Sequence, residues 1–127
     1  MTKILLVDDK ELILYSLSKT LRNSGADVTT VTNGKDALQE IQKSAFDICF
    51  LDVQLPDANG LDLMKIIRDA SSKTRIIIMT AVSLNEAQLQ LMRDYSCLYL
   101  PKPFDLNQVQ ALVRELIGNP GATLAEA

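Results

Sequence analysis

Short apolar runs alternate along this chain with longer segments in which apolar residues recur every three or four positions. Runs of this length predict buried strands, and the period of the longer segments predicts amphipathic helices. The five predicted strands are Lys3–Val7, Asp27–Val31, Ile48–Leu51, Arg75–Thr80 and Leu98–Pro101. A chain that alternates strand and helix in this way is restricted to a small number of folds.

The predicted helices have recognisable starts and stops. The first runs from Lys10 to about Asn23, and Gly25 lies just beyond it, where a glycine commonly ends a helix. The predicted N-terminal caps are Asn33 for the second helix, Ser83 with Glu86 as a capping box for the fourth, and Asp105 for the fifth. In the fourth helix Leu84, Ala87 and Leu91 form one stripe, while Leu89 and Met92 lie toward another side. We therefore expect Leu89 to face a partner protein.

Unbroken apolar strands between amphipathic helices indicate a parallel sheet that is covered on both faces. Right-handed crossovers then produce a doubly wound α/β fold. Pro101 removes a hydrogen-bond donor from the fifth strand, which predicts that this strand lies at an edge of the sheet. The flavodoxin-like strand order 2-1-3-4-5 meets that condition. The prediction is a five-stranded (βα)5 domain with this order.

The chain length of 127 residues fits one domain. We expect residues 1–118 to form it and residues 119–127, which are small and poorly patterned, to be a flexible tail or the stub of a linker. No apolar stretch approaches the ~20 residues of a membrane span, and no signal pattern is visible, so we expect a cytoplasmic protein. The formal net charge of −3 argues against direct nucleic-acid binding.

Carboxylates gather at the ends of the predicted strands. Asp8 and Asp9 follow the first strand, and Asp52 ends the third. In doubly wound folds chemistry takes place beyond the carboxyl ends of the strands, so these groups converge if the two strands are neighbours. Like charges this close raise one another's pKa, and a bound cation relieves the repulsion. Oxygen ligands favour Mg²⁺, Mn²⁺ or Ca²⁺ over zinc, and a site completed by water favours Mg²⁺.

Each acidic or basic residue has a plainer explanation when it is taken alone. Asp9 is in place to cap the first helix, Asp52 to form a turn before Pro56, and Lys102 to be a solvated surface lysine. Their joint position at the ends of separate strands of one sheet favours the metal site.

Four segments resemble, in order and spacing, the signature blocks of the response-regulator receiver domains of two-component signal transduction, the CheY-like family. They are LLVDDK (Leu5–Lys10), LDVQLPDANG (Leu51–Gly60), IIIMTA (Ile76–Ala81) and YLPKPF (Tyr99–Phe104). The resemblance extends to about Gly118. It implies a signalling phosphoacceptor that catalyses only its own phosphorylation and slow dephosphorylation, and not an enzyme in the usual sense.

The resemblance also implies a role for each residue of the acidic cluster. Asp52 is the phosphoacceptor and a ligand of Mg²⁺, for which Mn²⁺ is a substitute. Asp9 binds the ion directly, Asp8 holds it in part through water, and the backbone carbonyl of Gln54 supplies a further oxygen.

Further roles follow from the other blocks. Lys102 pairs with Asp52 and then with a phosphoryl oxygen, and a cis bond to Pro103 aims it into the site. Thr80 binds another phosphoryl oxygen and, with Tyr99, forms a switch. The switched surface comprises the fourth helix, the fifth strand and the fifth helix, which contact an output domain, a target protein or a second copy in a homodimer.

Several positions refine this expectation. The chain contains no histidine, so a phosphohistidine donor belongs to a sensor histidine kinase or a phosphotransfer protein. Val82 cannot hydrogen-bond a hydrolytic water, which predicts slow loss of the phosphoryl group. Tyr95 and Ser96 stand where many relatives carry Gly-Ala, so the fourth helix cannot end on glycine there.

Two alternatives remain at this point. A receiver-like interaction module that is never phosphorylated would have the same fold. A haloacid-dehalogenase-like phosphatase also uses an aspartate nucleophile, but it requires Asp-x-Asp after the first strand, where this chain has the adjacent pair Asp8 and Asp9.

Overall fold

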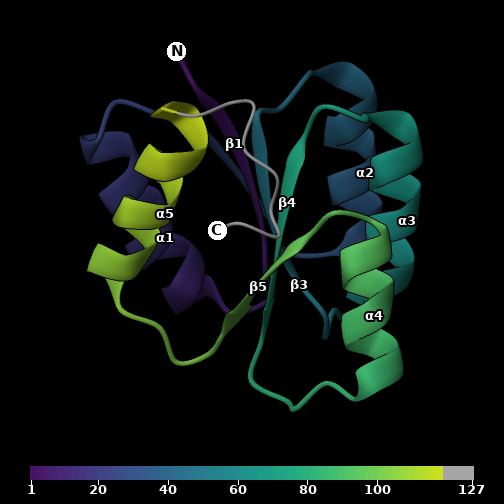
Figure 1. The fold of residues 1–127 in the computed structure, drawn as a ribbon. Helices are drawn as coiled ribbons and strands as arrows, with labels where there is room; N and C mark the ends of the chain where they lie inside the picture. Colours follow the sequence, from purple (N-terminus) through teal and green to yellow (C-terminus); the bar gives the residue numbers. More distant parts are fainter. Residues whose placement is uncertain (119–127) are drawn as a thin grey trace.

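The computed structural model describes residues 1–118, which form five strands and five helices in strict alternation (Figure 1). The strands are β1 (Lys3–Val7), β2 (Asp27–Val31), β3 (Ile48–Asp52), β4 (Arg75–Thr80) and β5 (Leu98–Pro101). The helices are α1 (Glu11–Asn23), α2 (Gly34–Lys43), α3 (Gly60–Ala70), α4 (Glu86–Asp94) and α5 (Leu106–Gly118). Among these helices none is long and apolar enough to cross a membrane.

All strand pairs are parallel, and their order in the sheet is β2-β1-β3-β4-β5. The flavodoxin-like order is therefore confirmed, and β5, with Pro101, lies at an edge. The part of the prediction that concerns residues 119–127 lies outside the described residues.

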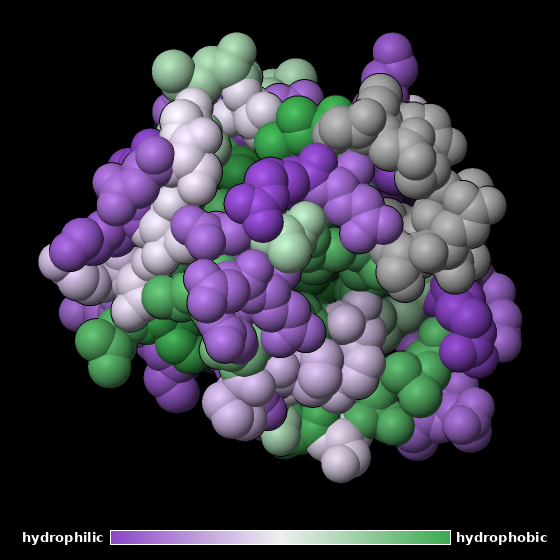
Figure 2. Space-filling model, turned by 60° about the vertical axis from the view of Figure 1, so that its left-hand side comes forward, coloured by the Kyte–Doolittle hydropathy of each residue, from purple (hydrophilic) through white to green (hydrophobic). Residues whose placement is uncertain are grey.

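Helices cover both faces of the sheet. Figure 1 shows α1 and α5 on one side and α2, α3 and α4 on the other. Successive residues of β1 face opposite sides: Ile4 and Leu6 pack in the cluster under α1 and α5, whereas Leu5 and Val7 pack in the cluster under the other helices. On the α1 and α5 side, hydrophobic residues at the surface lie in small groups between hydrophilic ones (Figure 2). The three central strands β1, β3 and β4 are thus buried on both faces, as their unbroken apolar runs require, whereas the edge strands β2 and β5 keep exposed residues.

The helix starts agree with the predictions except at α4. Asn33 caps α2 by accepting a hydrogen bond from the Asp36 N–H at 2.8 Å. The capping box predicted at Ser83 and Glu86 is wrong. Asn85 and Gln88 form the box instead, with reciprocal bonds of 2.8 and 2.9 Å. The two signals overlap in the sequence, and asparagine is as strong an N-cap as serine.

The expectation that Leu89 lies outside the core-facing side of α4 is also wrong. Met92 is the buried residue of α4, at 2% exposure, and Leu89 packs against the same core cluster. Ala87, which was placed with Leu84 and Leu91, is exposed. Leu84 and Leu91 pack against this cluster as well. A short helix with apolar residues on several sides therefore does not reveal its inner face from the sequence alone.

Candidate functional site

The strand register brings the predicted site residues to one edge of the sheet. Val7 pairs with Leu51 and Asp52 with Met79, so Asp8 continues β1 beside the end of β3. Thr80 ends β4 opposite Pro101, the residue before Lys102. The carboxyl ends of β1, β3, β4 and β5 therefore lie at one edge of the sheet. Asp52 and Thr80 are the last residues of β3 and β4, and Asp8 and Lys102 directly follow β1 and β5.

Three carboxylates meet at this edge. Asp8 is fully buried, Asp52 is 4% exposed, and Asp9 lies at the surface. One carboxylate oxygen of each lies within 4.8 Å of the others. Oxygen atoms alone make up this donor set, and such a set suits a hard divalent cation of the Mg²⁺ class.

Lys102 reaches the cluster from the loop after β5. Its Nζ lies 2.8 Å from Asp8 Oδ2 and 3.4 Å from Asp52 Oδ2. Its backbone N–H donates to the Thr80 carbonyl at 2.9 Å, and the peptide bond to Pro103 is cis. The side chain is only 13% exposed, so the alternative of a solvated surface lysine is wrong.

The remaining plain explanations also fail. The N-cap of α1 is Lys10, without a side-chain cap, so Asp9 is not a helix cap. Asp8 instead accepts the Lys10 N–H at 2.9 Å, and Asp9 has a 3.7 Å ion pair to the Lys10 side chain. Asp52 is the last residue of β3 and is buried, so it is not a solvated turn residue.

The charges in the pocket are not balanced. Burial raises the pKa of Asp52, the Gln54 N–H lowers it through a 3.1 Å hydrogen bond to Oδ1, Asp8 raises it, and Lys102 lowers it. The Lys102 ammonium group thus faces two buried carboxylates, and the third carboxylate, Asp9 at the rim, has a 3.7 Å ion pair with the exposed Lys10. A divalent cation would remove the excess negative charge, so the residues fit a metal site.

The loop after β3 depends on close backbone packing at Gly60. A Cβ on this residue would collide with the backbone oxygen of Asp52 and lie 2.6 Å from the Cα of Val53. The Gly60 N–H donates to the Val53 carbonyl at 2.7 Å. Only glycine allows α3 to begin this close to the proposed phosphoacceptor.

Thr80 and Tyr99 lie on neighbouring strands. Thr80 is 1% exposed, and its hydroxyl oxygen accepts the Val82 N–H at 3.1 Å. Tyr99 is 37% exposed, and Val82 is also at the surface, at 41%. The threonine hydroxyl is therefore held at the edge of the acidic pocket, while the tyrosine ring extends toward solvent.

Sequence reasoning missed Asp57. Its carboxylate accepts the N–H groups of Gly34 and Lys35 at 2.7 and 3.0 Å, across 23 and 22 residues of sequence. These bonds lower its pKa. The available signal was Gly34 at the first position of α2, which leaves room for another segment to approach. This glycine does not specify which loop of the chain approaches it.

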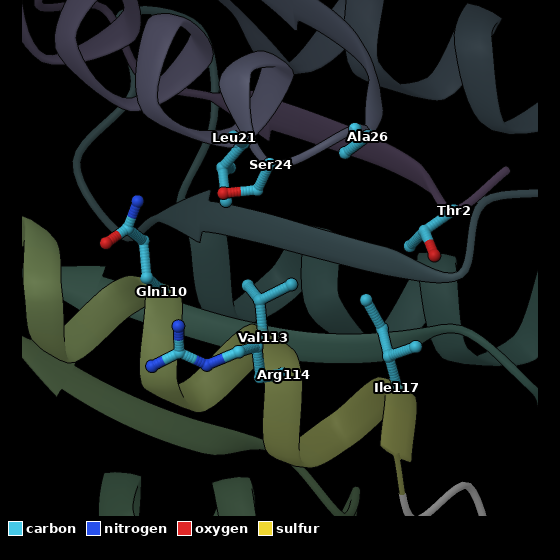
Figure 3. A pocket seen from close by; sticks show the side chains of 9 residues that line it. Thr2, Leu21, Ser24, Ala26, Gln110, Val113, Arg114 and Ile117 are labelled. Atoms are coloured by element: carbon cyan, nitrogen blue, oxygen red, sulfur yellow. The ribbon is translucent and has the colours of Figure 1, made fainter.

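A separate cavity of about 250 Å³ lies between α1 and α5 (Figure 3). Thr2 and Ala26, which line it, precede β1 and β2, so the cavity is at the opposite end of the sheet from the carboxylates. It therefore belongs to a different part of the molecule from the acidic site.

Comparison with known proteins agrees with this geometry. Residues 4–114 match the family described as the response regulator receiver domain. The chain belongs to this family, whose members are signalling phosphoacceptors that partner with histidine kinases and output domains. The alternative of a haloacid-dehalogenase-like phosphatase is therefore wrong.

Individual relatives share the whole domain. A two-component response regulator from Clostridium difficile is 26% identical, with a TM-score of 0.89 over 96% of this chain and 100% of that one. TrrA from Thermotoga maritima, solved in complex with Mg²⁺–BeF, is 29% identical, with a TM-score of 0.81 over 91% of this chain and 99% of that one. The DNA-binding transcriptional regulator NtrC of Escherichia coli K12 is 34% identical over 89% of this chain, which spans only 24% of NtrC.

Proposed function

We propose that Asp52 accepts a phosphoryl group from a phosphohistidine on a sensor histidine kinase or phosphotransfer protein. Mg²⁺, or Mn²⁺ in its place, would be held by Asp8, Asp9, Asp52 and the backbone carbonyl of Gln54. The observation that carries the proposal is the convergence of three carboxylates within 4.8 Å, two of them in contact with the Lys102 ammonium group. The Mg²⁺–BeF complex of the similar TrrA supports the choice of ion.

In the proposed reaction an Asp52 carboxylate oxygen attacks phosphorus. The new O–P bond makes an acyl phosphate, the P–N bond to the donor imidazole breaks, and its electron pair returns to the nitrogen. When bound, Mg²⁺ neutralises charge on the phosphoryl oxygens. Lys102 leaves its contact with Asp8 or Asp52 to pair with one of those oxygens, and Thr80 donates its hydroxyl proton to another.

Phosphorylation would then switch the surface formed by α4, β5 and α5. Thr80 gives up its contact with the Val82 N–H as it turns toward the phosphoryl group, and Tyr99 rotates inward from its exposed position. This surface would contact an output domain, a target protein or a second copy of the chain. An output domain agrees with relatives such as NtrC, of which the chain spans 24%. We place the protein in the cytoplasm, with residues 1–118 as the receiver and 119–127 as a tail or linker.

The test is incubation with Mg²⁺ and a small phosphodonor, followed by intact-mass measurement. The wild type should gain one phosphoryl group, and Asp52→Ala should gain none. The group should decay slowly in the wild type and faster in Val82→Glu, whose carboxylate could orient a water. A wild type that gains no mass would support the silent interaction module instead.

A further inference from the structure

The first turn of α2 receives its hydrogen-bond acceptors from two different parts of the chain. Asn33, next to the helix, accepts the Asp36 N–H at 2.8 Å. Asp57, in the loop between β3 and α3, accepts the Gly34 and Lys35 N–H groups with its two oxygens, at 2.7 and 3.0 Å. A carboxylate at a helix N-terminus is also favoured by the helix dipole. The bonds therefore join a loop to a helix that lies far from it in sequence.

The contact is close on the helix side as well. A Cβ on Gly34 would lie 3.0 Å from the Cβ of Ala58 and 3.3 Å from Asp57 Oδ1. The helix is itself fixed to the sheet, since Ala37 is fully buried in the core cluster. Loop and helix are thus fitted to each other, and the helix provides a rigid support.

The same loop frames the phosphoacceptor. At its base the Gly60 N–H bonds to the Val53 carbonyl at 2.7 Å, and Gln54 forms a bridge with Asn59. The Gln54 N–H donates to Asp52 Oδ1 at 3.1 Å. Asp57 attaches the tip of the loop to α2, so a displacement of the tip would reach Gln54 through the bridge.

We propose that Asp57 is a positioning residue for phosphoryl transfer, which clamps the loop of residues 53–59 onto α2 and thereby holds the Gln54 backbone against Asp52. The proposal rests on the phosphoacceptor function assigned above. Asp57 touches none of the reacting atoms, and it acts through Gln54, whose N–H orients one Asp52 oxygen and whose carbonyl is a proposed metal ligand. The lowered pKa of Asp57 keeps its carboxylate ionised, and so able to accept both bonds, at neutral pH.

The experiment compares Asp57→Ala with Asp36→Ala. Asp36 is an exposed acidic residue in the first turn of α2, the turn that Asp57 contacts. Among the described residues it has no hydrogen bond to the loop of residues 53–59. Both variants remove one negative charge from the start of α2. Asp57→Ala should weaken Mg²⁺ binding about 10-fold, in the range known for residues that support metal ligands, whereas Asp36→Ala should leave it unchanged. Asp57→Asn, which keeps one acceptor oxygen, should lie between them.

Amide hydrogen exchange supplies a readout that needs neither metal nor phosphodonor. The Gln54 amide of the metal-free protein should exchange faster in Asp57→Ala than in Asp36→Ala, measured with the free energy of unfolding of each variant. Equal Gln54 exchange in the two variants would overturn the inference, however well either is phosphorylated. A wild type that takes up no phosphoryl group would count against the proposed function alone.

Gly34→Ala perturbs the clamp from the helix side while Asp57 remains in place. It should also weaken Mg²⁺ binding, although alanine has the higher helix propensity. Because both changes act on one contact, the Asp57→Ala and Gly34→Ala effects should not add in the double variant. Full additivity would show that the two residues influence the site independently, and would contradict the clamp.

Discussion

The two ends of the sheet hold their charged groups in opposite ways. At the carboxyl ends of the strands, Lys102 faces the buried carboxylates of Asp8 and Asp52. Near the amino ends of β4 and β5, the guanidinium group of Arg68 donates to backbone carbonyls 2.7 to 3.5 Å away. The acceptors belong to Ser71, Ser72, Thr74, Tyr95 and Ser96.

The difference indicates that the carboxylate cluster is a binding site and that the Arg68 contacts stabilise the fold. Arg68 joins the end of α3 to the turn between α4 and β5 by donating to backbone carbonyls of both segments. The carboxylate end has more negative charge than its lysine neutralises, and it becomes balanced only with a cation. Loss of the Arg68 side chain should therefore cost stability, whereas removal of the Asp52 charge should increase it.

The largest expected effect of a single substitution is at Arg68. Arg68→Ala removes a charged donor from several carbonyls at once, and it should lower the free energy of unfolding by about 2 kcal/mol. Urea denaturation measures this loss. Arg93→Ala is the control, since Arg93 is exposed and bonds to Gln90 within its own helix, and it should change stability by less than about 0.5 kcal/mol. Equal losses of unfolding free energy in the two variants would show that the Arg68 contacts do not stabilise the fold.

The acidic end should respond in the opposite direction and with pH. The pKa of Asp52 is raised in the folded protein, so the folded state binds its proton more tightly and loses stability as pH rises from the ordinary aspartate pKa through the raised one. Asp52→Asn should therefore be more stable than the wild type at neutral pH, by about 1 kcal/mol. The difference should vanish below the ordinary aspartate pKa of about 3.9. Thermal unfolding across this pH range, without divalent cations, makes the measurement.

Asp57→Asn is a control of opposite sign. The pKa of Asp57 is lowered by its two backbone hydrogen bonds, so it contributes stability above the ordinary aspartate pKa that is lost as pH falls. This variant should be less stable than the wild type at neutral pH and should approach it in acid.

Mg²⁺ should stabilise the wild type by about 2.7 kcal/mol at 100 times its Kd, and Asp52→Asn by less. A wild type that gained no more than Asp52→Asn would exclude Asp52 from the metal site.

The same contrast marks the limit of sequence reasoning. Asp8, Asp52 and Lys102 were found because strand ends follow from the apolar pattern, and parallel strands bring their carboxyl ends together. The contacts of Asp57 with α2, and those of Arg68 with Tyr95 and Ser96, were not found, because each joins segments more than 20 residues apart through backbone groups that every residue carries. The inner face of α4 was misjudged for a related reason: its apolar residues surround the helix, and only packing against the core selects Met92.

The turn that Arg68 holds includes a strained residue. Ser96 has a φ of 56°, in the left-handed region that favours glycine. The α4 end nevertheless forms a Schellman motif, in which the Ser96 N–H bonds to the Arg93 carbonyl at 3.0 Å and the Cys97 N–H to the Met92 carbonyl at 2.9 Å. The absence of glycine therefore leaves the helix end in its usual geometry at a cost in backbone energy.

Ser96→Gly should remove this strain without disturbing the Arg68 contacts, which use only the backbone of residue 96. The left-handed region costs a non-glycine residue about 1 kcal/mol, and the greater freedom of glycine in the unfolded chain offsets part of the gain, so we expect a net stabilisation of about 0.5 kcal/mol. The urea midpoint should rise with an unchanged slope. Ser72→Gly, at a residue that also offers its carbonyl to Arg68 but has no positive φ, should be destabilising. If both variants shifted the midpoint in the same direction, the φ of Ser96 would carry no energetic cost, and the Arg68 end of the sheet would be relaxed throughout.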